Sequence, residues 1–227
     1  MKIIVIGALQ IEIEHLIKKT QALLTDKIFD LDLYKSTIGK HDVFIMQCSV
    51  GKVNAAICTQ KAIQMLKPDF IMNTGIAGSL RPDNKIGTII IGSEITYHDV
   101  RPSQMQRFFP YTEVFSSDSA AVQQIYQCTK DNFDNIDIKI GKIVTGDTFI
   151  DKAALKQGIY ARYHADCVDM ESAAIAHTCY VHSIPFVCVR TICDNADENS
   201  IIEYQTFEKS SAIINSKIIY TFLMTSE

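Results

Sequence analysis

Apolar and polar positions along the chain follow two periods, one typical of strands buried in a sheet and one typical of helices. Residues 2–7, 69–73 and 185–193 are nearly continuous apolar runs, which predict strands covered on both faces. In residues 9–24 and 52–66 apolar side chains recur at helical spacing. The chain therefore begins as an alternation of strands and helices.

The same two periods predict most of the remaining elements. Further strands are expected at 33–37, 41–48, 86–97 and 138–145, further helices at 117–132, 171–182 and 204–224, and a short helix after Asp151. Residues 100–116 show no clear period and contain two prolines, so we expect a loop there. Strands that alternate with helices imply crossover connections, and the chain is therefore predicted to be an α/β protein with a largely parallel or mixed central sheet.

Composition and charge indicate which partners and which cell compartment to expect for a protein of this predicted fold. The 227 residues are 47% hydrophobic and carry a net charge of −4 with no basic run, so neither nucleic acid nor an anionic membrane is an expected partner. The apolar N-terminal run is short, which predicts a first strand rather than a signal peptide. No run reaches about 18 apolar residues, the length of a membrane span. We expect a cytoplasmic protein.

Cysteine usage and the glycine motifs bear on cofactors. The seven cysteines include no C-x-x-C pair and lie mostly in apolar runs, which is typical of reduced intracellular thiols and gives no metal-ligand cluster. The phosphate-binding G-x-x-x-x-G-K-[ST] loop and the dinucleotide fingerprint G-x-G-x-x-G are both missing. We therefore expect no metal and no cofactor.

Polar residues gather just after the predicted strands, where ligands bind in open α/β sheets. The five motifs are Gly7–Glu12, Ser49–Lys52, Asn73–Leu80, Val168–Ala174 and Val189–Asp197. Taken singly, Glu12 and Glu171 could be helix-terminal carboxylates and Asp194 a cap. Arg190 is harder to explain this way, because a buried guanidinium needs a carboxylate partner. Both Asp169 and Glu171 are available.

The order and spacing of these motifs resemble the nucleoside phosphorylase superfamily and, within it, the bacterial nucleosidases of 5′-methylthioadenosine and S-adenosylhomocysteine. The resemblance extends from Met1 to about residue 222 and rests on Gly7-Ala8 with Glu12, Asn73–Gly78, Tyr97-His98-Asp99, Gly146-Asp147 with Phe149-Ile150, Met170-Glu171 with Ala174–Ala176, and Arg190 with Asp194. It implies a single nucleoside phosphorylase-like domain over residues 1–227, with three α/β/α layers around a twisted mixed sheet.

The resemblance also implies a reaction: hydrolysis of the bond between adenine and ribose, in methionine salvage and in recycling by-products of S-adenosylmethionine, with 5′-deoxyadenosine as a further candidate substrate. Asp194 matches the acid that protonates the leaving base, and Glu12 matches the base that activates water. Glu171 matches the carboxylate that holds the ribose hydroxyls, and Arg190 the group that orients water and acids.

Implied substrate contacts involve mostly apolar side chains. Phe149 would stack on adenine, the backbone of Ile150 would read its edge, and Met170 would lie under the ribose. The other implied pocket positions are Leu9 and Val50 at the 5′ substituent, Ile76 near the ribose and Tyr204 at the aromatic lid.

Some positions depart from the family's pattern. Ile76 and Cys193 stand where serine is usual, and Asp169 where glutamate is usual. The segment 100–109, which in the family reaches the partner's 5′-alkylthio pocket in a homodimer, is unusual here, so the preferred 5′ group stays open. Arg101 and Arg107 either recognise a carboxylate tail or are solvated loop residues. Two other functions also stay open: a purine nucleoside phosphorylase on the same fold and a non-catalytic purine-binding protein.

Overall fold

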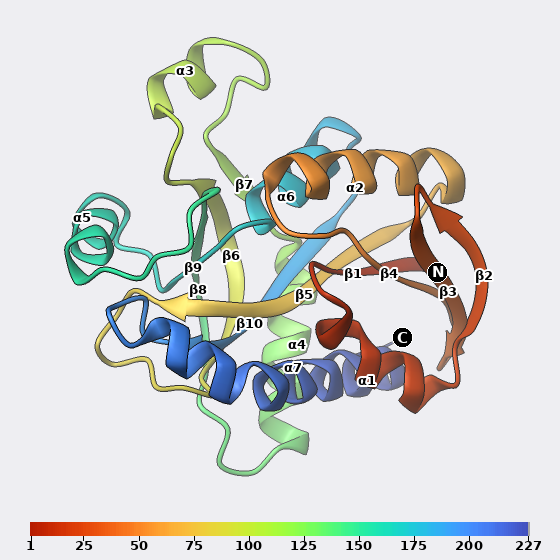
Figure 1. Cartoon of the computed structure of the whole chain (residues 1–227). Helices are drawn as coiled ribbons and strands as arrows, with labels where there is room; N and C mark the ends of the chain where they lie inside the picture. Colours follow the sequence, from red (N-terminus) through yellow and green to blue (C-terminus); the bar gives the residue numbers. More distant parts are fainter. Residues whose placement is uncertain (227) are drawn as a thin grey trace.

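A mixed β-sheet with helices packed on both faces forms the body of the protein (Figure 1). The computed structural model describes residues 1–226. In chain order the elements are β1 (Lys2–Gly7), α1 (Gln10–Thr20), β2 (Leu23–Ile28), β3 (Leu31–Ile38), β4 (His41–Gln47), α2 (Lys52–Leu66), β5 (Phe70–Ser79), β6 (Ile89–Tyr97), α3 (Pro102–Arg107), β7 (Val114–Ser116), α4 (Ser119–Asn132), β8 (Ile138–Thr145), α5 (Ala153–Tyr163), β9 (Cys167–Asp169), α6 (Ser172–Val181), β10 (Phe186–Asp194) and α7 (Ser200–Thr225).

The strand order is β10-β6-β8-β9-β5-β1-β4-β3-β2, with β7 added beside β6. Strand β10 also pairs with β5, in parallel, so β10, β6, β8, β9 and β5 close into a ring. Parallel pairs such as β1–β4 occur beside antiparallel pairs such as β5–β9. The predicted mixed sheet is confirmed, and the pairing of β10 with β5 adds a closed end to it.

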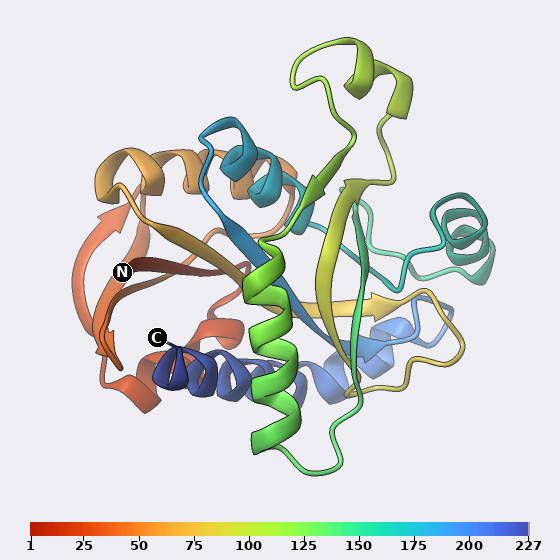
Figure 2. The same ribbon diagram turned by 180° about the vertical axis from the view of Figure 1, so that it is seen from behind.

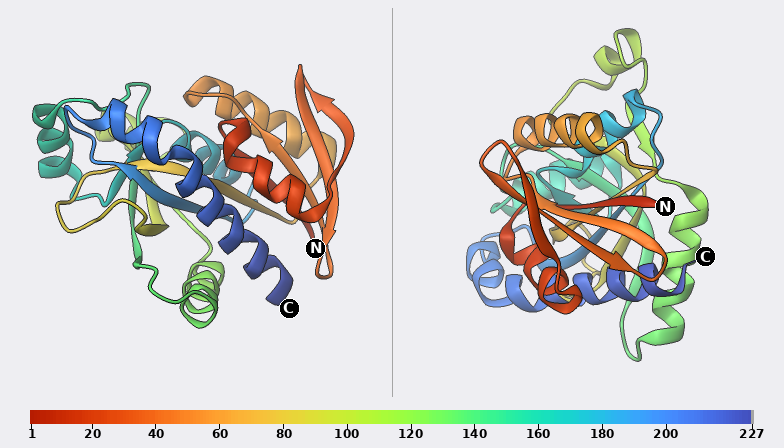
Figure 3. Two further views of the ribbon diagram at one scale, coloured as in Figure 1. Left: turned by 60° about the horizontal axis from the view of Figure 1, so that its bottom comes forward. Right: turned by 90° about the vertical axis from the view of Figure 1, so that its right-hand side faces the viewer.

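Strand β1 shows how the sequence produces the layers. Ile4 and Ile6 face the apolar core that contains residues of α2 and α6, whereas Ile3 and Val5 face the core that contains residues of α1, α4 and α7. Because successive strand side chains point to opposite faces, a continuous apolar run serves both cores. Figure 2 shows α4 crossing α7, and Figure 3 shows α7 alongside α1, on the second face.

The structure corrects several of the boundaries predicted for helices, strands and loops. The helix predicted over 9–24 ends at Thr20, where Gln21 takes a left-handed φ of 50°, and Leu23 and Leu24 open strand β2. Both leucines are exposed, so their apolar character misled the helix assignment. The predicted loop 100–116 contains the short helix α3 and strand β7.

Strand β5 extends six residues beyond its predicted end at residue 73, to Ser79. The segment Asn73-Thr74-Gly75 looks like a turn in the sequence, yet it stays in the sheet because its backbone pairs with β10. Strand β9, of three residues, was not predicted. Its pairing with both β5 and β8 brings Asp169 into the ring of strands.

Helix α7 is attached to the ring by a buried amide. The Asn215 side chain donates from Nδ2 to the backbone oxygens of Gly75 (2.7 Å) and Val189 (2.9 Å), on β5 and β10. These bonds hold α7 against the two strands that carry several candidate site residues. No helix among residues 1–226 is long and apolar enough to cross a bilayer.

We predict that Asn215→Ala lowers the free energy of unfolding by about 1–3 kcal/mol, because two buried carbonyl groups lose a donor. Urea denaturation followed by circular dichroism measures this. The control is Ser210→Ala on the exposed side of the same helix, which should cost within about 0.5 kcal/mol. Equal effects of the two substitutions would mean that the amide does not anchor α7.

Candidate active site

A cavity of about 380 Å³ lies beyond the carboxyl ends of β1, β5, β9 and β10, beside the start of α7. Every site residue named from the sequence except Arg190 lines it: Leu9, Glu12, Val50, Ile76, Phe149, Ile150, Met170, Glu171, Asp194 and Tyr204. Residues 1–226 contain no group of three or more His, Cys, Asp or Glu side chains placed to hold a metal ion. The cavity walls are mostly apolar, with four carboxyl groups among them, of which Asp169 is the one not named as a site residue from the sequence.

Glu12 is held at the cavity floor by backbone donors. Its Oε2 accepts from the N–H groups of Ala8 (2.6 Å) and Leu9 (2.9 Å), and its Oε1 from that of Ile76 (3.0 Å). Burial raises the pKa of Glu12, and the nearby charge of Arg190 opposes that rise. A Cβ on Gly75 would lie 2.6 Å from Oε1, so only glycine leaves room for this carboxylate.

Asp194 is the last residue of β10 and is 3% exposed. Its Oδ1 accepts from the Ala196 N–H at 2.9 Å, and its Oδ2 accepts from the Cys193 thiol at 3.2 Å. Burial raises the pKa of Asp194, although the bond from Ala196 lowers it. The result is a carboxyl group that holds its proton more tightly than an aspartate in water.

Glu171 immediately precedes α6 and reaches across to the start of α2. Its Oε1 accepts from the Gly51 N–H at 2.8 Å. Burial, followed by the charge of Asp169, raises the pKa of Glu171 to about 8. A carboxyl group that titrates near neutrality in a cleft is a common feature of functional sites.

Arg190 lies behind the cavity wall and connects three elements. Its Nε donates to Asp169 Oδ2 at 2.8 Å, and one terminal nitrogen donates to the Asn73 side-chain oxygen. Asp169 also accepts from Thr145 Oγ1 at 2.5 Å and from Ser172. The structure thus selects Asp169 over Glu171 as the partner of the guanidinium, and Arg190 supports the site from outside the cavity.

The cavity walls bring together residues from distant parts of the chain. The Phe149 and Tyr204 rings meet edge to face with centroids 5.9 Å apart. Ile76 packs in a small apolar cluster that contains Cys193 and touches Tyr204. Ile201 and Gln205, on the first turns of α7, complete this wall and were not predicted from the sequence. Ile201 lies three residues before Tyr204, a helical spacing that would have suggested it, and Gln205 lies four residues after Ile201.

Three segments around the cavity are joined by charged groups. Lys52 Nζ donates to Asp99 Oδ2 at 2.6 Å and lies 3.6 Å from Asp147 Oδ2. The Lys52 and Asp147 backbone N–H groups donate to Asp147 Oδ1 and Asp99 Oδ2. These contacts tie the start of α2 to the loop that carries Phe149. They give the motifs around Asp99 and Asp147 a structural role.

The segment 100–109 does not enter this chain's own cavity. It projects from the body of the protein with α3, as Figure 1 shows, and Arg101 and Arg107 are both exposed. Neither arginine lines the cavity. Their interpretation as solvated loop residues fits the isolated chain.

An α/β fold with an apolar cavity and buried carboxyl groups at its strand ends defines a class of proteins that bind or transform small molecules. The family model that matches the chain is the phosphorylase superfamily, over residues 2–223. The chain belongs to this superfamily.

Individual relatives sharpen this assignment. A 5′-methylthioadenosine/S-adenosylhomocysteine nucleosidase from Exiguobacterium sp. (strain AT1b) is 31% identical over 96% of both chains. One from Staphylococcus aureus (strain bovine RF122) is 32% identical over 95% of this chain and 96% of the relative. The crystal structure of the Neisseria meningitidis nucleosidase of the same name, in complex with methylthio-immucillin-A, matches with a TM-score of 0.91 and 29% identity over 99% of both chains.

The raised pKa of Glu171 predicts a pH-dependent cost to stability. Between pH 4.5 and about 8 the folded protein keeps a proton that the unfolded chain has lost, so this group lowers stability as pH rises through that window. Glu171→Gln removes this titration. The Tm of the Glu171→Gln variant minus that of the unsubstituted protein should therefore be larger near pH 8 than near pH 4.5.

Differential scanning fluorimetry across the window measures this difference. Asp30→Asn, which removes the charge of an exposed carboxylate in the turn between β2 and β3, is the matched control. If the Glu171→Gln difference is independent of pH, then Glu171 does not keep its proton in the folded protein.

Proposed function

We propose that this chain hydrolyses the N-glycosidic bond of 5′-methylthioadenosine and S-adenosylhomocysteine, releasing adenine and the 5′-substituted ribose. The observation that carries the proposal is the convergence of Glu12, Glu171 and Asp194, all with raised pKa values, on one apolar cavity. The names of the relatives support the choice of substrate. Apolar walls suit a purine ring and an alkylthio group, and carboxyl groups suit cleavage through a positively charged ribosyl state.

Asp194 is the proposed acid. Adenine departs as a poor anionic leaving group unless its ring gains a proton as the bond to ribose breaks. The buried carboxyl of Asp194 retains a proton for this purpose, because burial disfavours its ionised form. The electron pair of the broken bond stays with the base, and Asp194 is left as a carboxylate.

Glu12 is the proposed base, and Glu171 the proposed ribose ligand. The three backbone donors hold both Glu12 oxygens in place, so one of them can take a proton from a water that attacks the ribosyl carbon. An ionised Glu171 would accept from ribose hydroxyls and stabilise the positive charge on the sugar. Arg190, held by Asp169, opposes the rise in the pKa of Glu12 and so favours its basic form.

The proposed substrate contacts follow the wall residues. The ring of Phe149 would stack on adenine, the backbone of Ile150 would read its edge, and Met170 would lie under the ribose, with Ile76 near it. Leu9 and Val50 would contact the 5′ group, and Tyr204 would form the aromatic lid; all seven residues line the cavity. Ile76 places a methyl-bearing side chain where a hydroxyl would offer a polar contact, which makes this part of the wall more apolar.

Phosphorolysis is the competing reaction on this fold, and the lining argues against it. Among the lining residues that the structure describes, none is a lysine or arginine that could hold phosphate inside this chain's cavity. A non-catalytic purine-binding protein is the other alternative. Such a protein would not need three buried carboxyl groups, each of which costs free energy to remove from water.

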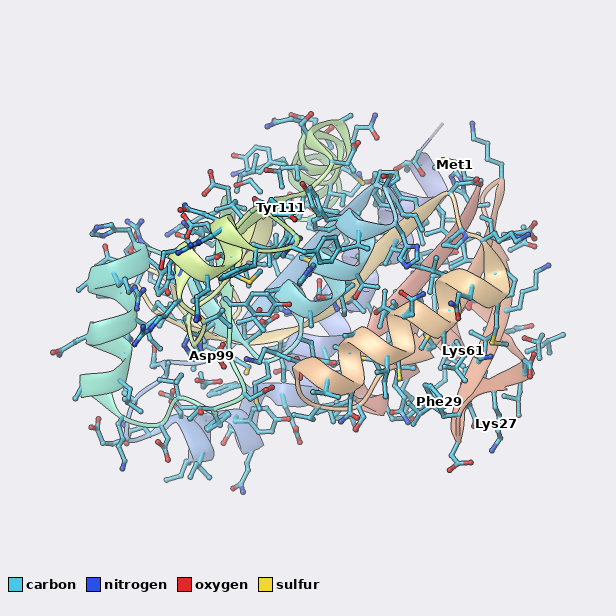
Figure 4. The ribbon with its side chains drawn as sticks, turned by 90° about the horizontal axis from the view of Figure 1, so that it is seen from above. Met1, Lys27, Phe29, Lys61, Asp99 and Tyr111 are labelled. Carbon is cyan, nitrogen blue, oxygen red and sulfur yellow. The ribbon has the colours of Figure 1, made fainter. Side chains whose placement is uncertain are left out.

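We also propose a homodimer formed through an apolar surface, the α2/α6 surface, that consists of Val53, Ile57, Phe109, Tyr180 and Val181. All five side chains are exposed, and the Phe109 ring lies 6.5 Å from that of His177 on α6. Figure 4 shows α2 and α6 on this face, with Asp99 and Tyr111 marking the ends of the projecting segment. Exposed apolar clusters of this kind are typical of association sites. Segment 100–109 would then reach the partner's site.

Asp194→Asn should lower the rate of adenine release from 5′-methylthioadenosine by about 10²-fold or more, because the amide has no acidic proton to give. Binding of the substrate should persist, since the amide fills the same space. Chromatography of adenine in samples quenched at successive times measures the rate of release, and isothermal titration calorimetry measures binding of the substrate. Asp197→Asn, three residues further along, is the control. Near-normal turnover by Asp194→Asn would refute the assigned role.

Ile57→Asp should convert a dimer to a monomer, because it places a charge on the α2/α6 surface. Size-exclusion chromatography with light scattering reads the mass directly. Leu155→Asp on α5 changes a side chain of nearly equal exposure away from that surface and should leave the dimer intact. A monomeric unsubstituted protein, or a dimer that survives Ile57→Asp, would contradict this interface.

A further inference from the structure

The two oxygens of the Asp194 carboxyl have different neighbours. Oδ1 accepts from the Ala196 backbone N–H at 2.9 Å, a group that can only donate. Oδ2 lies 3.2 Å from the Cys193 sulfur, and a thiol can donate weakly or accept weakly. Of these two neighbours only the thiol can accept a hydrogen bond, so a proton on Oδ2 has an acceptor beside it that a proton on Oδ1 does not find in the Ala196 N–H.

Cys193 is suited to donate a hydrogen bond and unsuited to act as a nucleophile. It lines the cavity wall but is only 1% exposed. Burial, followed by the negative charge of Asp194, raises the pKa of its thiol. Because the thiolate is the reactive form, the sulfur keeps its proton and stays unreactive in this position.

We propose that Cys193 is a positioning residue, whose thiol contacts Oδ2 of Asp194 and sets how readily the transferable proton of that carboxyl leaves. The inference rests on the proposed role of Asp194 as the acid. While the carboxyl is neutral, the thiol makes only a weak hydrogen bond to it and leaves its proton in place. Once the proton has moved to the leaving base, the S–H group donates to the carboxylate that remains. The thiol itself neither gains nor loses a proton.

The strength of this donor determines the direction of its effect. A hydrogen bond to a carboxylate favours the ionised form, and a thiol is a weaker donor than a hydroxyl. A hydroxyl at position 193 would therefore lower the pKa of Asp194, and a methyl group would raise it.

Other groups that face Asp194 stay constant in such a comparison. On α7, the charge of Glu203 raises the pKa of Asp194, and Ser200 lowers it by hydrogen bonding. The Glu203 carboxylate is held by the Asn195 backbone and side chain at 2.8 Å each. On α1, Glu12 acts on the Cys193 thiol through its charge. From β5 the nearest neighbour is Gly78, which is not titratable.

The test compares Cys193→Ser and Cys193→Ala with the unsubstituted enzyme. The alkaline limb of kcat/KM for adenine release, which reports loss of the proton from Asp194, should move to lower pH in the serine variant and to higher pH in the alanine variant. Each shift should be on the order of one pH unit. Because serine and alanine have nearly the same volume, a packing defect would move both variants in the same direction. Shifts in one direction, or no shift, would overturn the proposal.

Cys179→Ala, which removes a fully buried thiol from α6, is the matched control and should leave the limb in place. A second readout does not depend on turnover. The S–H stretching band of Cys193, isolated as the infrared difference between the unsubstituted protein and Cys193→Ser, should shift to lower frequency as Asp194 ionises. Asp194→Asn should abolish that pH-dependent shift.

The two readouts separate two kinds of failure. If no adenine is released but the S–H band follows the ionisation of Asp194, the proposed function fails and the contact between thiol and carboxyl stands. If adenine is released and the band does not move with pH, the inference about Cys193 is wrong while the nucleosidase proposal survives.

Discussion

The buried guanidinium of Arg190 is the constraint on which the site depends. A charge that is 2% exposed must be paired, and its partners Asp169 and Asn73 lie on β9 and β5, on either side of the cavity's back wall. Satisfying that charge holds β10, β9 and β5 in a fixed relation. Strands β10 and β5 then carry Asp194 and the backbone N–H of Ile76 to the cavity, and Glu171 follows two residues after the end of β9.

The same burial determines the chemistry of the carboxyl groups. Arg190 is one positive charge near three acidic groups, Asp169, Glu12 and Glu171, all largely removed from water. Asp169 forms the ion pair with Arg190 at 2.8 Å. The charge of Arg190 also acts on Glu12 and Glu171, but it does not cancel the effect of burial, and the pKa values of both stay raised. Burial likewise raises the pKa of Asp194, and hydrogen bonds to its ionised form oppose that rise. Fixed dipoles and charges in such a dry site act more strongly on a reacting sugar than they would in water.

Most of the elements predicted from the sequence have side chains buried in a regular period, and the strands that were missed do not. Strand β1 was recognisable because every second residue serves each core, whereas β2 has mostly exposed side chains and β9 has only three residues. Strand β5 was cut short because Asn73 and Thr74 are polar, although both are buried in the sheet. Local patterns do not record which strands will be neighbours, so the pairing of β10 with β5 could not be predicted.

More of the candidate site than of the strand pairing could be predicted from the sequence. The motifs follow predicted strands, which places them at one edge of the sheet, and their order resembles that of a known family. What the sequence left open was pairing across space. Both Asp169 and Glu171 were available to Arg190, and only the arrangement of β9 and α6 decides for Asp169 and turns Glu171 toward Gly51. The contact between Cys193 and Asp194 was similarly unpredicted, because neighbouring strand residues normally point to opposite faces and these two meet only at the strand end.

Water activated in this cavity is the nucleophile that we propose cleaves the bond between adenine and ribose. The most direct test of this proposal is incubation of the protein with 5′-methylthioadenosine in phosphate-free water enriched in ¹⁸O, followed by mass spectrometry of both products. We predict free adenine and a methylthioribose that carries one ¹⁸O atom at the carbon that held the base. Cleavage that requires added phosphate and yields a ribose 1-phosphate, or the absence of any cleavage, would contradict it.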